Sequence, residues 1–564
     1  MIREKIEEKI KKAFRSEFRL KLDKIELVNP EPQFGDFALA CHSFAKELKM
    51  PPQEIARKLS KRIKDKIIAK TDSKAGYLNI TVDQAVLSEQ VLSEAVRKED
   101  KYGESSKNKQ KHVIEYSSPN TNKPLHLGHI RNNVLGMSIA NLLITQGADV
   151  KKVQLINDRG IHIMKSLVAY QKLGQGKTPE DAHEKGDHFV GKYYVQFNEE
   201  TMMEDAKEAL RKWEKGDREI KDLWENMNKW VYEGFDGTYK ALGSEFDKNY
   251  YESEIYETGR KIIEQGIENG VFKKEDDNSV SVDLEDIGLD KKILQRSDGT
   301  SIYVTQDLAL AVARQEEWNA DSLIYIVGHE QEYHFKVLFE ILKRLGYDWA
   351  KNLYHLSYGL VFLPEGKMKS REGKVVDADN IISEVQDLAA KEIKKRFPDI
   401  SDAELGQRSE VIGMGALKFM LLKINPTQAI HFNPKEAISF EGSTGPYVQY
   451  AHARISSILK NQDLQDCDDV DFELLKEQEE REVVLKLMQY EEVVQDAARN
   501  FNPSAVCNYL LEFSHIFNTF YHKHHVLKAE DEDTKNARLV LIRAVQIVLR
   551  NGLDILEIKA PNKM

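Results

Sequence analysis

The segment that decides the fold covers residues 112–129 and reads HVIEYSSPNTNKPLHLGH. Its first residues are mostly apolar or β-branched and lead into Ser-Pro-Asn, a pattern that predicts a strand followed by a turn. A helical pattern then runs from about Leu125 to Gln146 and stops at Gly147. A second strand-like run, VQLI at 153–156, follows. Strand, helix and strand make a βαβ unit, so the sequence predicts a parallel sheet that begins here.

Alternation of this kind resumes further along the chain. A charge-rich, mainly helical stretch interrupts it at about 164–294, and a hairpin is predicted at Asp298-Gly299. A helix from Asp307 to Trp318, a strand at 323–327, a helix at 333–345 and an extended run at 354–363 follow. We therefore expect an α/β multidomain protein. Its expected parts are an α+β N-terminal domain (1–108), a Rossmann-like parallel sheet with a helical insertion (109–383) and a C-terminal α-helical bundle (384–564).

Composition excludes several classes of protein. The chain has 564 residues, a net charge of −11 and no apolar run long enough to span a bilayer. The N-terminus lacks the pattern of a signal peptide. The three cysteines, at 41, 467 and 507, lie too far apart to suggest a disulfide framework or a cysteine-rich zinc site. We expect no membrane span, no structural metal and a cytoplasmic location.

Positive charge is nevertheless concentrated near the N-terminus. Residues 1–24 contain nine basic and five acidic residues, and residues 57–70 contain seven basic and one acidic residue. Such runs form either a solvated helix face or a surface that contacts nucleic-acid phosphates. Composition alone does not choose between these two interpretations.

Two histidines open the first predicted helix, where backbone N–H groups and the helix dipole favour a phosphate. His126 and His129 lie three residues apart, so both rings can face one anion. Gly128 between them leaves room for a flat base. The alternative is an ordinary helix start with two exposed imidazoles.

A basic segment follows the last predicted strand and reads GKMKSREGK at 366–374. Lysines and an arginine between glycines suit a clamp on a triphosphate, although a solvated basic loop has the same composition. Ligands of open α/β sheets bind at the carboxyl ends of the strands. The two segments follow the first and the last strand, so we expect them to meet at one edge.

Together these segments resemble the His-Ile-Gly-His and Lys-Met-Ser-Lys-Ser signatures of class I aminoacyl-tRNA synthetases. The first reads HLGH at 126–129, but the second has Ser370 where the signature has its second lysine. The arginyl-tRNA synthetase branch is similar in that loss and tends to carry a lysine upstream of the first motif, where this chain has Lys123.

The resemblance to that branch extends over essentially the whole chain. It is carried by GDFA at 35–38, GYLN at 76–79, EYSSPN at 115–120, YVTQD at 303–307, VGHEQEYHF at 327–335 and GPYVQYAHAR at 445–454. It implies a class I synthetase fold and ATP-dependent ligation of L-arginine to tRNA(Arg) through arginyl-adenylate. It also implies Mg²⁺ bound with ATP, and a monomer.

The resemblance assigns roles to individual positions. Residues implied to meet the phosphates are Lys123, His126, His129, Lys367, Lys369 and Arg371. Further ATP-binding positions are Pro119, Gly128, Gly328, His334, Met368 and Ser370. Arginine-binding positions are Glu115, Ser117, Asn120, His126, Tyr303, Asp307 and Gln331. Positions implied to contact tRNA are Tyr77, Asn79, Tyr447, Tyr450 and Arg454.

Residue chemistry is compatible with an arginine substrate. A guanidinium is planar, permanently charged and offers a fork of donors, so a selective pocket requires carboxylates in its plane. Glu115 and Asp307 are the candidates, and Tyr303 adds a hydroxyl. The alternatives are an exposed strand-end carboxylate for Glu115 and a helix N-cap for Asp307. For the tyrosines at 447 and 450, the alternative is a place in the bundle core.

Two other functions share parts of this pattern. Small adenylyltransferases use the same nucleotide fold but lack large helical appendages, whereas this chain has about 180 residues after Glu384. A non-enzymatic tRNA-binding protein could retain the scaffold, but this chain keeps Lys123, His126 and His129.

Overall fold

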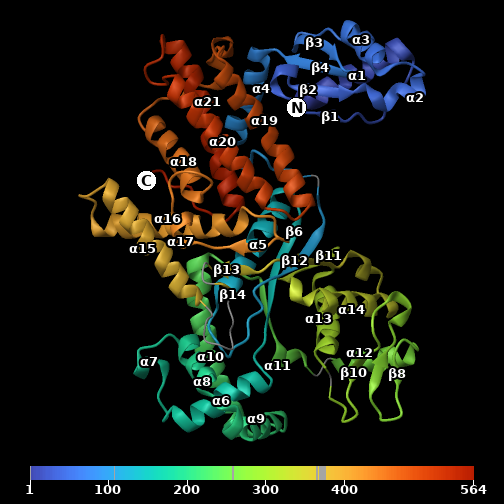
Figure 1. The fold of residues 1–564 in the computed structure, drawn as a ribbon, viewed down its shortest axis with the longest axis vertical. Helices are drawn as coiled ribbons and strands as arrows, with labels where there is room; N and C mark the ends of the chain where they lie inside the picture. The colour runs from blue at the N-terminus through green and yellow to red at the C-terminus, as the bar shows by residue number, and fades with distance from the viewer. Residues whose placement is uncertain (1, 107, 257–258, 301, 364–365, 368–375) are drawn as a thin grey trace.

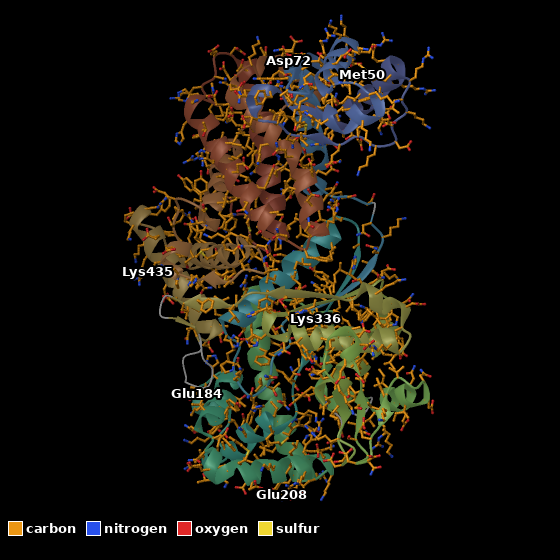
Figure 2. All side chains as sticks on the ribbon, turned by 45° about the vertical axis from the view of Figure 1, so that its right-hand side comes forward. Met50, Asp72, Glu184, Glu208, Lys336 and Lys435 are labelled. Atoms are coloured by element: carbon orange, nitrogen blue, oxygen red, sulfur yellow. The ribbon has the colours of Figure 1, made fainter. Side chains whose placement is uncertain are left out.

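The computed structural model describes residues 2–106, 108–256, 259–300, 302–363, 366–367 and 376–564. The N-terminal domain lies at one end of the molecule, beside the C-terminal helices, and the parallel sheet lies in the middle (Figure 1). A helical insertion forms the opposite end. Figure 2 shows this length: Met50 and Asp72 lie at one end, and Glu184 and Glu208 lie towards the other.

The central sheet is parallel throughout and has the strand order β12-β11-β5-β6-β7. Its strands are β5 (Lys111–Glu115), β6 (Asp149–Ile156), β7 (Lys248–Tyr251), β11 (Ser322–Gly328) and β12 (Tyr354–Tyr358). Helix α5 (Leu127–Thr145) joins β5 to β6 and is buried along most of its length, as an apolar helix against a sheet must be. The predicted βαβ unit is confirmed.

The predicted helical insertion at 164–294 is not one block. Helices α6 (Ile161–Leu173), α8 (Gly186–Gln196), α9 (Glu199–Glu214) and α10 (Arg218–Leu242) are followed by β7, which pairs with β6 in the central sheet. A small antiparallel sheet of β8 (Lys273–Lys274), β9 (Val280–Val282) and β10 (Lys292–Gln295) comes next. The prediction missed β7 because four residues in a charged stretch carry too little periodicity.

The chain folds back on itself at Asp298-Gly299, as predicted. The N–H of Arg296 donates to the Thr300 carbonyl at 2.9 Å, and the N–H of Ile302 donates to the Leu294 carbonyl at 3.2 Å. Of the two arms, β10 is a strand in the described residues, and the second arm leads directly into helix α13 (Tyr303–Trp318), which begins four residues before the expected start at Asp307. Over so short a stretch, the apolar positions of YVTQDLAL at 303–310 suit either a helix or a strand, so they do not predict where the helix begins.

The N-terminal domain packs helices α1 (Ile2–Phe18) and α3 (Pro52–Arg62) on a four-stranded antiparallel sheet. Its strand order is β1-β2-β4-β3, with β1 (Leu27–Val28), β2 (Phe37–Ala40), β3 (Ile68–Lys74) and β4 (Tyr77–Val82). Helix α4 (Gln84–Lys98) leads from this domain towards the central sheet.

The C-terminal half is helical, as predicted. It comprises α15 (Ala378–Arg396), α16 (Asp402–Leu422), α18 (Gly445–Leu459), α19 (Gln478–Arg499), α20 (Ser504–Lys523) and α21 (Glu532–Ile555). Backbone pairing crosses the expected boundary at residue 384, because β15 (Ile430–His431) pairs with β13 (Val361–Leu363). In the described part of the chain, no helix combines the length and apolar composition needed to cross a bilayer.

A buried arginine fixes α5 against the chain that leads to the basic segment. The Arg131 guanidinium, fully buried, donates to the carbonyl oxygens of Gly359, Leu360, Pro426 and Gln428. Burial of a charge is tolerated where its donors meet acceptors. These bonds set the position of β13 relative to His129, two residues before Arg131.

Candidate active site

The first histidine motif forms the start of α5. His126 is the N-cap, and its Nδ1 accepts the Gly128 N–H at 3.1 Å. The His129 Nδ1 accepts the His126 N–H at 3.1 Å, and the two ring centroids lie 3.9 Å apart. A Cβ on residue 128 would lie 2.9 Å from the His126 ring, so glycine is needed there to admit this ring. Gly128 thus admits the His126 ring, and its contact with a base stays a prediction.

Both histidines are neutral hydrogen-bond donors near pH 7. Burial, with the nearby Lys123 charge, lowers the pKa of His126 to about 4. Burial also lowers the pKa of His129 well below its usual range. Because each Nδ1 accepts a backbone N–H, the proton of each ring resides on Nε2. Each ring can therefore donate one hydrogen bond to an anion.

Lys123 lies beside these rings without a counter-ion among the described residues. It lines a cavity of about 540 Å³ together with Asn120, His126 and His188. Burial lowers its pKa, and no neighbouring carboxylate in the described part of the chain offsets that effect. A half-buried ammonium of this kind favours an anionic ligand.

The second signature segment is only partly described. Lys367 lies in β14 (Gly366–Lys367), which pairs with β13 through Phe362. The predicted residues Met368, Lys369, Ser370 and Arg371 lie outside the described residues. The chain that follows them returns to the first motif, because Leu127 N–H donates to the Val376 carbonyl at 3.1 Å. The Ala378 N–H also donates to the Leu125 carbonyl at 2.9 Å.

Glu115, expected to hold a substrate guanidinium, is paired inside the protein. Its carboxylate forms an ion pair with Arg314 of α13 and accepts a hydrogen bond from the Ser118 hydroxyl at 3.0 Å. Arg314 is 1% exposed, and Glu115 is 8% exposed. Burial disfavours the Arg314 cation, but Glu115 outweighs this and the pKa of Arg314 is raised. Glu115 is thus neither an exposed carboxylate nor a free one.

Ser117 also faces the interior. Its hydroxyl lies 2.7 Å from the Tyr239 hydroxyl of α10 and accepts from the Asn133 amide at 3.1 Å. Its φ of +69° turns the chain sharply after β5. These contacts hold the Ser117 side chain within the fold and shape the turn after β5, and its contact with arginine stays a prediction. Asn120, three residues later, is exposed at the carboxyl edge of the sheet.

Asp307 lies in the second turn of α13, and its Oδ2 is 2.7 Å from His334 Nε2 in α14 (Glu332–Arg344). The N-cap interpretation of Asp307 is therefore wrong, because α13 begins at Tyr303. Tyr303 is 68% exposed and lies one helical turn before Asp307, on the same face. Gly328 ends β11 with nothing within 4 Å of a Cβ position, and Gln331 is exposed just beyond it.

A third carboxyl group, that of Glu252, was not predicted from the sequence. It follows β7 directly, at the same carboxyl edge, and is 6% exposed. Burial raises its pKa to about 7, the Arg159 charge opposes this, and Asp158 and Asp307 add to it. Asp307 is thus near enough for its charge to contribute to this shift. Recognition of β7 as a strand would have identified it.

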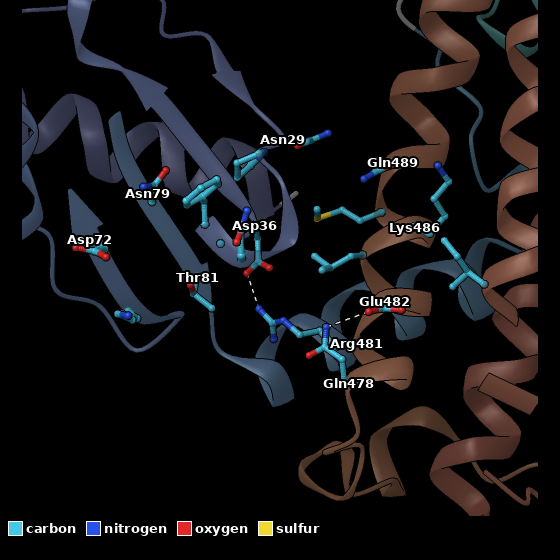
Figure 3. Close-up of a pocket in the computed structure, with 18 of the residues that line it drawn as sticks. Asn29, Asp36, Asp72, Asn79, Thr81, Gln478, Arg481, Glu482, Lys486 and Gln489 are labelled. Carbon is cyan, nitrogen blue, oxygen red and sulfur yellow. Dashed lines mark hydrogen bonds and ion pairs between the residues drawn. The ribbon is translucent and has the colours of Figure 1, made fainter. Parts of the chain in front are cut away.

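The residues expected to contact tRNA lie in two places. Tyr77 is 39% exposed on β4, and Asn79 lines a cavity of about 550 Å³ between the N-terminal sheet and α19. Figure 3 shows this cavity, with Asp36 bonded to Arg481 across it.

In the bundle, Tyr447 accepts a hydrogen bond from Asn518 at 3.0 Å, and Arg454 lies over the rings of Tyr450 and Tyr521. Tyr447 and Tyr450 are both half-buried, so neither is a fully enclosed residue of the bundle core. The Tyr450 ring contacts Arg454. Further along the bundle, His524 Nε2 lies 2.9 Å from a carboxylate oxygen of Glu479.

Comparison with known proteins identifies the family. Residues 89–433 match a family described as "tRNA synthetases class I (R), catalytic domain". Residues 1–82 match the arginyl tRNA synthetase N-terminal domain, and residues 448–564 match the DALR anticodon binding domain. The chain belongs to the arginyl-tRNA synthetase family.

Whole-length relatives agree with this membership. The arginine–tRNA ligase of Treponema denticola is 46% identical over 93% of this chain and 92% of its own length. That of Parabacteroides distasonis is 39% identical over 96% of each chain. The arginyl-tRNA synthetase of Thermus thermophilus has the same fold, with a TM-score of 0.84 over the full length of both chains at 28% identity. The class I synthetase fold expected from the sequence is confirmed.

Proposed function

We propose that this protein attaches L-arginine to tRNA(Arg) with ATP, through an arginyl-adenylate, and releases pyrophosphate and AMP. The observation that supports it most is the backbone pairing of residues 125–127 with residues 376–378. This pairing brings residues 376–378, which follow the basic segment, beside His126, and Asp377 lines the same cavity as Lys123. Cationic and hydrogen-bond donor groups from both signature segments then meet one triphosphate.

The amino-acid pocket is formed by α13, α14 and the end of β7. Asp307 and Glu252 supply carboxylates for the guanidinium, and the Tyr303 hydroxyl adds a hydrogen-bond partner. Lysine lacks the planar fork and citrulline lacks the charge, so this pair of carboxylates selects against both. Asn120 and Gln331, both exposed at the same edge, are proposed to hold the α-amino and carboxylate groups. Glu115 supports this pocket through Arg314, which belongs to the same helix as Asp307.

In the activation step, the arginine carboxylate attacks the α-phosphorus of ATP in line, and pyrophosphate leaves. No protein nucleophile is needed, so catalysis consists of positioning and charge stabilisation. Lys123 supplies a positive charge, and the Nε2–H groups of His126 and His129 donate to phosphate oxygens. Lys367, Lys369 and Arg371 are proposed to add charge from the basic segment. Pro119, Gly128, Gly328, His334, Met368 and Ser370 remain proposed contacts of ATP.

Mg²⁺ is proposed to accompany ATP, and when bound it would neutralise part of the phosphate charge. The described groups beside His126 are mainly nitrogen donors, and Asp377 there already accepts backbone N–H groups. Phosphate oxygens rather than a protein cage would therefore hold the ion.

Recognition of tRNA is proposed for the two ends of the enzyme. Tyr77 and Asn79 would contact the tRNA body, and Tyr447, Tyr450 and Arg454 would meet unstacked anticodon bases. The terminal ribose of the tRNA then attacks the adenylate and yields arginyl-tRNA. We further propose that the protein is a monomer. We also propose a cytoplasmic location, in keeping with three buried cysteines that form no disulfide.

An aminoacylation assay with each of the twenty amino acids, total tRNA and ATP tests this function. We expect charging with arginine alone. Charging with another amino acid would contradict the pocket assignment. Adenylate formation without any charged tRNA would favour a small-molecule adenylyltransferase, and binding of tRNA without adenylate formation would favour a non-enzymatic tRNA-binding protein.

A further inference from the structure

A cluster of charged side chains connects the helical insertion to the start of α15. His188 lies in the first turn of α8, and its Nε2 is 3.1 Å from an Asp377 oxygen and 3.1 Å from an Asp379 oxygen. Lys185, the N-cap residue of α8, has its Nζ 2.6 Å from Asp379 and 2.6 Å from the hydroxyl of Thr238. The cluster thus joins α8, α10 and α15, which are far apart in the sequence.

Each carboxylate of the cluster already lies beside a cationic side chain, either Lys185 or His188. The two carboxylates raise the pKa of His188 to about 10, so this side chain is a cation near neutral pH. The pKa of Asp379 is lowered because the hydrogen bonds and charges of His188 and Lys185 outweigh its burial. Asp187, His188 and Asp379 have the composition of a metal site. However, Lys185 Nζ already lies 3.4 Å from Asp187 and 2.6 Å from Asp379, and it supplies the positive charge.

Asp377 connects this cluster to the candidate catalytic groups. It lies between Val376 and Ala378, whose backbones bond to Leu127 and Leu125, and it forms a β-bridge with His126. Its carboxylate also accepts the Asp379 N–H at 2.8 Å and thereby caps α15. A displacement of Asp377 would consequently move the backbone of His126.

His188 and His126 line the same cavity as Lys123. The side chain of His188 is 34% exposed, whereas Asp377 is 13% exposed. His188 is therefore the more exposed member of the pair. Asp377 is the more buried member, and its backbone pairs with His126. Arginine-pocket residues Asp307 and Tyr303 come from α13, which contributes no residue to this cavity within the described part of the chain.

We infer that His188 is a positioning residue for ATP, which acts by holding Asp377 and, through it, His126. This inference rests on the proposed function and assigns to the insertion a specific part in the activation step. Loss of the His188 contact would misplace a phosphate donor while leaving the proposed guanidinium contacts on α13 in place. Misplacement of reacting groups by about 1 Å can cost on the order of 10²-fold in rate.

The test compares His188→Gln, His188→Arg and Lys172→Gln in ATP–pyrophosphate exchange with saturating arginine and tRNA present. His188→Gln keeps a donor but loses the charge, and we expect the KM for ATP to rise or kcat to fall by about tenfold. The KM for arginine should rise less than the KM for ATP, because the guanidinium contacts proposed for Asp307 and Tyr303 lie on α13, outside this cavity. Apart from His126 of the histidine motif, only Asn120 among the proposed arginine contacts, all of which are described residues, lines the cavity. His188→Arg restores a cation and should recover most of the loss. Lys172→Gln removes an exposed ion pair with Asp205 of the same insertion and should change nothing.

A second variant guards against misfolding of the first. Asp377→Ser retains a capping oxygen for α15 and removes only the carboxylate that His188 holds. A folded Asp377→Ser enzyme with wild-type kinetics for ATP would overturn the inference. So would equal losses in the KM values for ATP and arginine, or a His188→Arg enzyme no better than His188→Gln. Failure of the wild-type enzyme to charge arginine would instead contradict the proposed function.

Discussion

The Nε2 atom of His334 lies 2.7 Å from the Oδ2 atom of Asp307, and this contact joins α14 to the exposed face of α13. It orients one carboxylate oxygen and leaves the other for a ligand. Tyr303 lies on the same face, and Glu252 is coupled to Asp307 by its charge. The proposed guanidinium site would thus have one carboxylate held by an imidazole ring and, in Glu252, another whose pKa burial raises to about 7.

Replacement of Asp307 by asparagine should weaken arginine binding. The change removes one charge from a half-buried pair, so we expect a loss of about 2 kcal/mol, or roughly 30-fold in the KM for arginine. Steady-state charging kinetics measure the effect. Asp286→Asn, which removes an exposed partner of Arg344, is the matched control and should leave the KM unchanged. An Asp307→Asn enzyme with unaltered KM and kcat for arginine would refute the assignment.

Arginine binding should strengthen as the pH rises through about 7. Glu252 has its pKa raised to about 7 in the folded protein, so it is largely protonated below this pH and charged above it. A bound guanidinium favours the charged form, so binding releases a proton. The KM for arginine, measured from pH 6 to pH 8, should fall, and Glu252→Gln should remove most of this dependence.

The same shift has the opposite effect on the free protein. Because the folded state holds the Glu252 proton more tightly than the unfolded state, stability is lost as the pH rises from about 4.5 through 7. Glu252→Gln should therefore raise the melting temperature at pH 8 in the absence of arginine. Equal melting temperatures of the two proteins at pH 8 would contradict a raised pKa of Glu252.

Lys123 should matter for activity and not for stability. Its ammonium is half-buried without a counter-ion among the described residues, so Lys123→Met removes a cost of folding while keeping much of the length of the side chain. We expect the activation rate to fall by about 100-fold and the melting temperature to stay equal or rise. Lys123→Ala should lower the rate more than Lys369→Ala does. The reverse order would mean that the basic segment supplies the main charge.

Glu115 and Arg314 should behave as a structural pair. Arg314→Met leaves Glu115 buried without its partner, so we expect a loss of about 3–5 kcal/mol in the free energy of unfolding. The double variant Glu115→Gln with Arg314→Met should recover part of this loss. Denaturant titrations measure both. If Glu115→Gln instead raised the KM for arginine at unchanged stability, Glu115 would be a direct ligand.

Local signals in the chain were enough for several conclusions. The 112–129 segment, with its β-branched run, its Ser-Pro-Asn turn and its helix start, predicts a strand, a turn and a helix correctly. The helical C-terminal half is also correct, because helix periodicity and capping depend on residues a few positions apart. Family membership follows from short motifs whose order along the chain is preserved.

Tertiary structure alone decided the partners of the charged groups. Glu115 pairs with a residue 199 positions away, and His188 pairs with residues near position 378. The periodicity of apolar residues along the chain does not predict such pairings, because they form only when strands and helices pack together. The strand that presents Glu252 was missed for the same reason: β7 is four residues long, and only its place beside β6 makes it a strand. The amino-acid order thus determined the elements and the chemistry available, whereas burial and long-range packing decided which carboxylates are left free for a ligand.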